Sequence, residues 1–307
     1  KATTPYRVDK TYIINTAYAG NPLTSNPNTL NNNQIVPERT TSPEFGIDMQ
    51  FFNENRLGFS LTYYITNSKN QIVPVQVSRA TGFASKILNA GEIENKGWEL
   101  TLTGAPVSNK NFRWDVAVNW SKNTNTVKAL PEGVENLQLG SFQGGVSINA
   151  TLGDAYGTIQ GSDYVYAEGH EGESAFRVVL PSGYYARSTT FDNVIGNITP
   201  DWILGLNNRF SIKNWTIEFL IDVQKGGNVF SLDQWYGKGT GLYETTDFTN
   251  DLGNPVRNTL DEGGGVILEG VDQDGNPNTV RVTAEDFRLF GWARNPNSGF
   301  IYDAGYV

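Results

Sequence analysis

The sequence predicts an all-β protein, specifically an antiparallel transmembrane β-barrel fragment with long extracellular loops. Apolar and polar residues alternate along three pairs of segments, short turns join each pair, and aromatic residues lie at the segment ends. Strand side chains switch face at every residue, so strict alternation makes a sheet with one apolar and one polar face. We expect hairpins at residues 44–65, 97–121 and 202–224.

In the first hairpin, the alternation continues on both sides of an expected turn at residues 53–55. The polar or small partners of the apolar residues include Asp48, Ser60 and Thr62. The apolar positions are Phe45, Ile47, Met49, Phe51, Leu57, Phe59, Leu61, Tyr63 and Ile65.

The second and third hairpins repeat this arrangement, and their strands approach the roughly 9–11 residues that a tilted strand needs to cross a bilayer. Asn208 and Leu220 break the alternation, one on each face. The apolar positions are Trp98, Leu100, Leu102, Phe112, Trp114, Val116, Val118, Trp120, Trp202, Leu204, Leu206, Phe210, Trp215, Ile217, Phe219, Ile221 and Val223.

The connections between hairpins are much longer than the turns inside them. They take 31 residues (66–96), 80 residues (122–201) and 75 residues (225–299). Short turns at one rim and long loops at the other are typical of an outer-membrane barrel, in which the short turns face the periplasm. We therefore expect the three long segments to be extracellular loops.

The aromatic residues favour the same orientation, because amphipathic rings prefer the membrane interfaces. Phe51, Phe112, Phe210 and Trp215 lie beside the short turns, and Tyr63, Trp98, Trp120 and Trp202 lie at the opposite ends. A secreted β-sandwich with buried aromatic residues would also alternate, so it stays open as the alternative.

Composition excludes several classes of function. Only 18% of the 307 residues are charged, the mean hydropathy is -0.39, and no run approaches the ~18 apolar residues of a transmembrane helix. With no cysteine, disulfide and thiolate chemistry are not available. The net charge of -9 argues against binding nucleic acid or docking on anionic lipid through a basic patch.

Both ends of the sequence suggest a piece of a longer protein. Lys1 is not preceded by an initiator Met, and no signal-peptide pattern follows it. Residues 300–307 are expected to begin a further strand. Six to eight strands cannot close a wide barrel, and open sheet edges are not tolerated in lipid. The remaining wall is expected to come from sequence outside these residues.

Six segments resemble, in order, SusC/RagA-type TonB-dependent transporters of the outer membrane of Bacteroidota. The resemblance covers nearly the whole chain. The segments are residues 36–48, 61–75, 89–100, 196–206, 219–227 and 236–245.

This resemblance implies that residues 1–307 are the C-terminal portion of a roughly 22-stranded barrel plugged by an N-terminal domain. Such proteins import oligosaccharides or peptides across the outer membrane, with energy delivered through TonB and with a SusD-like lipoprotein as a lid. The plug and the TonB box are not found in this sequence. A passive porin and a secreted glycan-binding β-sandwich are the competing functions, and no motif separates glycan from peptide cargo.

The long loops contain the candidate contacts to cargo or lid: Trp235, Tyr236, Tyr243 and Trp292. Aromatic faces stack on sugar rings or peptide side chains, although these rings could equally pack the loops together. An acidic, tyrosine-rich stretch at residues 163–185 is expected to be a solvated loop, with contact to the lid or a cationic substrate as the alternative.

No motif indicates catalysis, a metal or a cofactor. Residues 272–276 begin like a calcium loop, but the twelfth position is Thr283 instead of Glu. We expect a turn between Val271 and Val280 instead. The single histidine, His170, has no nucleophile pattern nearby, so the protein is not expected to be an enzyme.

Overall fold

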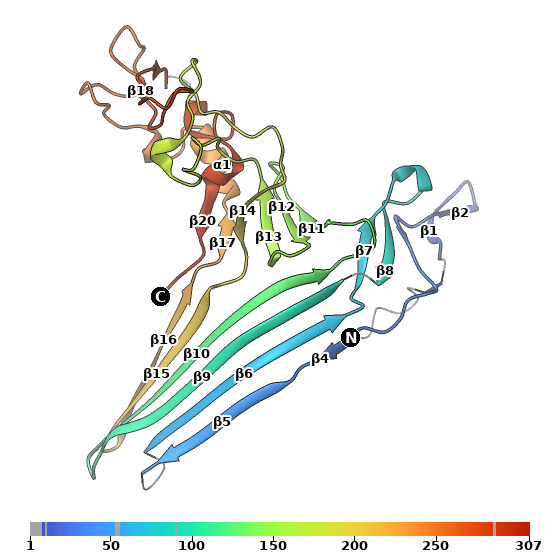
Figure 1. Ribbon diagram of the computed structural model, residues 1–307, viewed down its shortest axis with the longest axis vertical. Coiled ribbons are helices and arrows are strands. Elements are labelled where there is room, and N and C mark those ends of the chain that lie inside the picture. Colours follow the sequence, from blue (N-terminus) through green and yellow to red (C-terminus); the bar gives the residue numbers. More distant parts are fainter. Residues whose placement is uncertain (1–7, 10, 53–55, 90, 285–286) are drawn as a thin grey trace.

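The computed structural model describes residues 8–9, 11–52, 56–89, 91–284 and 287–307. A seven-stranded sheet, made of six long strands and the short β4, forms the lower half of Figure 1. Every strand pair in it is antiparallel, in the order β16-β15-β10-β9-β6-β4, with β5 also on β6. Its strands are β4 (Arg39–Thr41), β5 (Glu44–Phe51), β6 (Leu57–Lys69), β9 (Glu92–Ser108), β10 (Phe112–Ala129), β15 (Trp202–Ile212) and β16 (Trp215–Lys225).

The three expected hairpins correspond to β5–β6, β9–β10 and β15–β16. The strands run further than the alternation indicated, because the β6–β9 ladder continues to the pair Lys69 and Glu92, and β10 continues to Ala129. The loop starts expected at residues 66 and 122 were therefore too early. These extensions are mostly polar, with the buried pair Ile93 and Val127 as the apolar exception, so they lack the alternation while their backbones still pair. The turn expected at residues 53–55 lies outside the described residues.

The strand register aligns the apolar positions into one continuous face. Residues that lie directly opposite each other on adjacent strands point to the same face of the sheet. Each row of such residues across the strands therefore lies on one side of the sheet. One row contains Ile47, Leu61, Leu100, Trp120, Leu204 and Val223, and the next contains Met49, Phe59, Leu102, Val118, Leu206 and Ile221.

Asn208, the polar residue on this apolar face, is satisfied by a neighbour. It pairs with Val116 and Phe219 and is only 6% exposed. Its side-chain Oδ1 accepts a hydrogen bond from the indole N–H of Trp114 at 3.2 Å. A buried amide needs such a partner, so the break in alternation does not interrupt the apolar surface.

The opposite face of the sheet is mostly polar, with Ile203 and Leu220 as apolar exceptions. Thr101 Oγ1 donates to Asn119 Oδ1 at 3.0 Å across β9 and β10. Near the short turns, Asp115 forms an ion pair with Arg113 at 2.8 Å. A central row of this face contains Asp48, Ser60, Thr101, Asn119, Gly205 and Asp222.

The long connections, together with the segment before the first hairpin and residues 301–303, form smaller sheets above the long strands (Figure 1). In the described residues, β11 to β14 form a four-stranded sheet, β3-β8-β7 a three-stranded one, and the pairs β1–β2, β17–β20 and β18–β19 stand alone. Their bounds are β1 (Ile13–Tyr18), β2 (Asn21–Ser25), β3 (Thr29–Leu30), β7 (Ile72–Gln76), β8 (Ser85–Asn89), β11 (Asn136–Ser141), β12 (Ser147–Thr151), β13 (Tyr156–Gly161), β14 (Asn193–Asn197), β17 (Asn228–Phe230), β18 (Val266–Ile267), β19 (Arg281–Val282) and β20 (Ile301–Asp303).

Helical structure is short and confined to these connections. Within the described ranges, no helix is long and apolar enough to cross a membrane. The helices are α1 (Leu232–Gly239) and the 3₁₀ turns η2 (Arg79–Thr81), η3 (Ser174–Phe176), η4 (Glu244–Thr246), η5 (Phe287–Phe290) and η6 (Asn297–Phe300).

Two buried clusters hold the connections in place. Val75, Val127, Leu137 and Ala150 join two of the small sheets to the end of β10. Val256, Val282, Ala284 and Leu289 form the second cluster, with Tyr184 packed against it. The strand expected at residues 300–307 is confirmed in part: β20 pairs with β17 over three residues, and Tyr306 further on exchanges two backbone hydrogen bonds of 2.9 Å with Gln224.

Candidate functional site

Helix α1 positions two of the four aromatic residues expected to contact cargo or lid. Ser231 precedes the helix, and its hydroxyl accepts a hydrogen bond from the backbone N–H of Gln234 at 3.2 Å. This N-cap satisfies a free amide of the first turn, where Asp233 also complements the helix dipole. The helix then carries Trp235 and Tyr236.

All four of these aromatic residues meet around α1. The ring of Trp235 lies 4.7 Å from that of Tyr236 and 5.7 Å from that of Trp292, centroid to centroid. Tyr243 packs against Gly237, where an added Cβ would clash with the tyrosine ring. We call these four residues the aromatic cluster.

Some rings of the aromatic cluster pack against their neighbours, and others are exposed at the surface. Trp235 is half-buried between its neighbours, whereas Tyr236 is 37% and Trp292 45% exposed. The hydroxyl of Tyr236 accepts a hydrogen bond from the side chain of Gln143. The exposed rings leave flat apolar area open to a ligand, while Trp235 and Tyr243 support them.

The eight aromatic residues expected at the membrane interfaces lie on the apolar face of the sheet. Tyr63 and Trp98 are partners with ring centroids 4.7 Å apart, and Trp120 lies one pair further along, beside Leu100. At the short-turn end, Phe210 stacks on Phe112, Trp114 and Phe219. The sequence analysis had not counted Trp114 and Phe219 among the interface aromatic residues. The other members are Phe51, opposite Leu57, Trp202, opposite Lys225, and Trp215, opposite Ile212.

The acidic, tyrosine-rich stretch is not a simple solvated loop. Arg177 lies over the ring of Tyr164, 4.0 Å from its centroid, and 5.7 Å from that of Tyr185. Burial raises the pKa of the Tyr164 hydroxyl well above its usual value, and the nearby Arg177 cation opposes this only in part. The sequence had grouped these tyrosines with acids, while the structure groups Tyr164, Tyr166 and Tyr185 around the half-buried Arg177.

A cavity of about 530 Å³ opens beside this tyrosine group. It contains two arginines that the sequence interpretation missed, Arg187 and Arg294. They are 107 positions apart, so no local motif could have associated them. The lining residues are Ser162, Leu180, Ser182, Tyr184, Tyr185, Arg187, Ser188, Thr189, Phe191 and Arg294.

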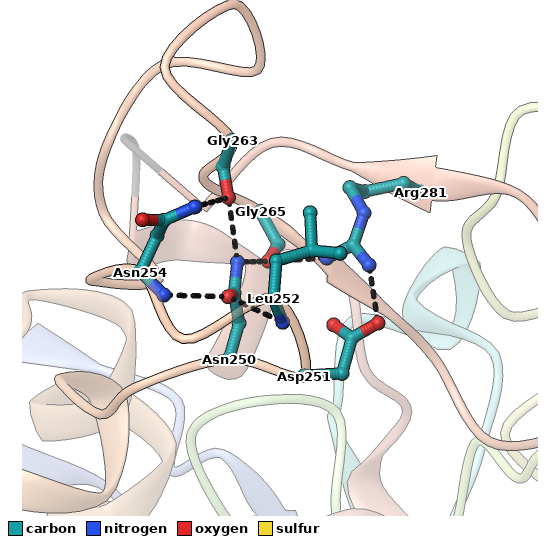
Figure 2. A network of polar contacts seen from close by, with 7 residues as sticks. All are labelled: Asn250, Asp251, Leu252, Asn254, Gly263, Gly265 and Arg281. Atoms are coloured by element: carbon teal, nitrogen blue, oxygen red, sulfur yellow. Dashed lines mark hydrogen bonds and ion pairs between the residues drawn. The ribbon is translucent and has the colours of Figure 1, made fainter.

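A polar network fixes the loop at residues 250–265 (Figure 2). The side-chain amide of Asn250 donates to the carbonyls of Gly263 and Gly265, both at 2.9 Å. Its Oδ1 accepts the backbone amides of Leu252 and Asn254 at 3.0 and 3.1 Å. Every hydrogen-bonding atom of this amide is used, which makes the loop a rigid support.

The same network includes a charged pair. Arg281 donates to the carbonyl of Gly265 at 3.0 Å and forms an ion pair with Asp251 (Figure 2). The hydrogen bond from Arg281 holds the pKa of the Asp251 carboxyl below its usual value.

Residues 271–280 form the expected turn. Val271 and Pro277 are bridge partners, and Asp272 Oδ1 accepts the backbone amides of Asp274 and Asn276, each at 2.9 Å. The Asn276 amide is the main cause of a lowered pKa at Asp272. Within the described residues, no group of three His, Cys, Asp or Glu could hold a metal ion.

His170 stacks on the ring of Phe176 at 3.7 Å, and its Nδ1 lies 3.4 Å from the Glu173 carboxylate. These contacts order the turn at residues 170–176 and bring no nucleophile to the histidine.

Residues 11–216 match the family model described as TonB dependent receptor-like, beta-barrel. The chain therefore belongs to the TonB-dependent receptor β-barrel family, a family of receptors and not of enzymes. The resemblance to SusC/RagA-type proteins is thereby confirmed. The match includes five of the six long membrane-type strands in full and the first residues of β16.

Curated relatives agree with the family. The chain is 29% identical over 217 residues to TonB-dependent receptor P3 of Formosa agariphila, covering 65% of this chain and 22% of the relative. It is 30% identical over 129 residues to TonB-dependent receptor SusC of Bacteroides thetaiotaomicron, covering 40% of this chain and 13% of that protein. The chain thus spans about a fifth or less of these relatives.

A solved structure shares the fold over nearly the whole chain. The RagAB peptide transporter structure superposes with a TM-score of 0.66 and 15% identity, covering 98% of this chain and 31% of the other. At this identity the likeness concerns the fold alone, which includes both the sheet and the long connections.

Proposed function

We propose that this chain supplies part of the wall and the outer loops of an outer-membrane importer, which takes up oligosaccharides or peptides in a TonB-dependent manner. The observation that carries this proposal is the apolar face that continues without a break across six strands. Lipid requires apolar side chains on one face and paired backbone throughout, so the sheet continues into further strands of the same barrel.

The orientation follows from the connections. The short turns face the periplasm, the small sheets and α1 lie outside the cell, and the polar face lines the lumen. The eight interface aromatic residues, together with Trp114, anchor the two rims of the wall. Barrel strands are tilted, so residues at the same depth in the membrane on neighbouring strands need not be directly opposite each other. Trp98 and Trp120 can therefore lie at the same interface although they are not partners.

The aromatic cluster is the proposed contact with cargo or with a SusD-like lipoprotein lid. Its two exposed rings, Tyr236 and Trp292, supply the stacking surface. Trp235 and Tyr243 act by supporting them. TonB engages a segment of the whole protein outside these residues.

Fractionation of the native host tests the proposal with the full-length protein. We expect the protein in the outer-membrane pellet and, after detergent extraction, a surface lipoprotein that co-purifies with it. A protein that stays in the supernatant after ultracentrifugation would support the soluble β-sandwich instead. Steady ion conductance of the purified protein in a planar bilayer would support a passive porin, since a plugged importer stays closed.

Variants then locate the contact. Trp292→Ala and Tyr236→Ala should weaken retention of the lipoprotein or uptake of the cargo. Phe142→Ala is the matched control, because Phe142 is also an exposed ring of the outer part, 53% exposed, outside the aromatic cluster. Equal effects of all three variants would contradict a specific role of the cluster.

A further inference from the structure

We propose that the cavity between residues 180–191 and Arg294 binds the carboxylate of an acidic oligosaccharide. The inference rests on the proposed function and deepens it by naming a chemical class of cargo. The site consists of Arg187 and Arg294, with Tyr184 and Tyr185 as walls, and is called the arginine pocket below.

The two guanidinium groups are held by neutral partners. Arg187 Nη1 donates to the backbone carbonyl of Trp292 at 3.5 Å. Arg294 lies over the ring of Tyr184, 4.0 Å from its centroid. These contacts orient the two groups and leave their positive charge uncompensated.

Two other arginines of the chain each have an acidic partner. Arg113 pairs with Asp115, and Arg281 pairs with Asp251. Among the described residues, no carboxylate forms an ion pair of 4.0 Å or less with Arg187 or Arg294. In a chain of net charge -9, two oriented and unneutralised cations in one cavity are a site for an anion.

The walls of the arginine pocket are rigid. Tyr184 packs against the second buried cluster, and the adjacent Gly183 fits against Val282 of that cluster. The backbone of Leu180 and Tyr184 closes the tip of this hairpin with a 2.8 Å hydrogen bond. Because Tyr184 is held by this packing, it offers the exposed Arg294 a fixed ring face, which lowers the ordering cost when a ligand binds.

The neighbourhood favours a sugar over a peptide as the carrier of the carboxylate. The carbonyl that orients Arg187 belongs to Trp292, whose ring is 45% exposed in the aromatic cluster. An acidic sugar can place its carboxylate on the arginines while the face of a neighbouring sugar stacks on an aromatic ring. Charged hydrogen bonds and stacking thus meet within one short oligomer.

The test uses the full-length protein purified in detergent, with trigalacturonate, its methyl-esterified trimer and triglutamate as probes in calorimetric titration. We expect trigalacturonate to bind about tenfold or more tightly than the neutral ester, in line with the worth of charged hydrogen bonds. Arg187→Gln and Arg294→Gln should each weaken trigalacturonate about tenfold and leave the ester unchanged. Arg79→Gln, which removes the same charge from the exposed turn η2, should change neither.

Several results would overturn the inference: equal affinity for acid and ester, no binding of trigalacturonate, or the same loss in Arg79→Gln as in the two pocket variants. Tighter binding of triglutamate, lost in those variants, would replace the sugar by a peptide. Failure of the transport proposal gives a different result. Trigalacturonate would still bind in detergent, but cells lacking TonB would take up as much labelled trimer as cells containing it.

Discussion

The long-stranded sheet and the connections above it are ordered by different means. In the sheet, one two-residue period repeats over six strands, and register alone brings Leu61, Leu100 and Trp120 into one row. In the connections, order comes from individual contacts such as the four hydrogen bonds of Asn250 and the contact between Arg177 and Tyr164. The sheet therefore tolerates change within a face, whereas the connections depend on single residues.

The solvent accounts for the difference. A wall in lipid gains from any apolar side chain on its outer face and loses from any charge there. Loops in water must instead satisfy their own backbone, which polar side chains do one group at a time. Four substitutions test this contrast, in order of decreasing effect.

Phe219→Arg places a charge in the middle of the proposed lipid face and should destabilise the folded barrel by roughly 2–4 kcal/mol. Leu220→Arg is the matched control, since Leu220 pairs with Asn207 on the polar face. Unfolding of the full-length protein from lipid vesicles by denaturant measures both. A larger loss for Leu220→Arg would mean that the two faces are assigned the wrong way round.

Asn250→Ala removes both donors to Gly263 and Gly265 and the acceptor of two amides, so the loop at residues 250–265 should lose about 2 kcal/mol of local stability. Asn254→Ala removes a single side-chain bond of 3.3 Å and should cost less. Hydrogen exchange of the amides of Gly264 and Gly265 reports the difference. Equal exchange in the two variants would remove the central role of Asn250.

Trp114→Phe should cost about 1 kcal/mol, because it leaves the buried Oδ1 of Asn208 without its donor. The double variant with Asn208→Leu should recover most of this stability, since both polar groups are then absent. Denaturant unfolding of the single and double variants completes the cycle. Additive losses would show that the hydrogen bond contributes nothing in the lipid-facing layer.

Alkaline pH should loosen the tyrosine group of the connections. Since the pKa of Tyr164 is higher in the folded state than the ordinary value of 10.0, the unfolded state releases its proton first as pH rises. Stability from this group is complete below pH 10 and falls above it. Tyr164→Phe should reduce the loss between pH 10 and 11, measured by limited proteolysis, while Tyr236→Phe should not.

The alternation in the sequence determined the six long strands, their pairing into hairpins and the apolar and polar faces. The sequence can determine these features because successive side chains in a strand point to opposite faces, so the face of each residue follows from its position alone. Even the two exceptions, Asn208 and Leu220, kept their places in the register opposite Phe219 and Asn207.

Only the tertiary structure decided where the strands end and what the connections hold. The extensions of β9 and β10 beyond the apolar stretch pair through mostly polar residues, so no alternation of apolar and polar side chains marks them in the sequence. Trp235 and Trp292 meet across 57 positions, and Arg187 and Arg294 share a cavity across 107. Such contacts depend on how separate segments fold back on each other, and no repeating pattern along the chain indicates which residues will meet across so large a separation in sequence.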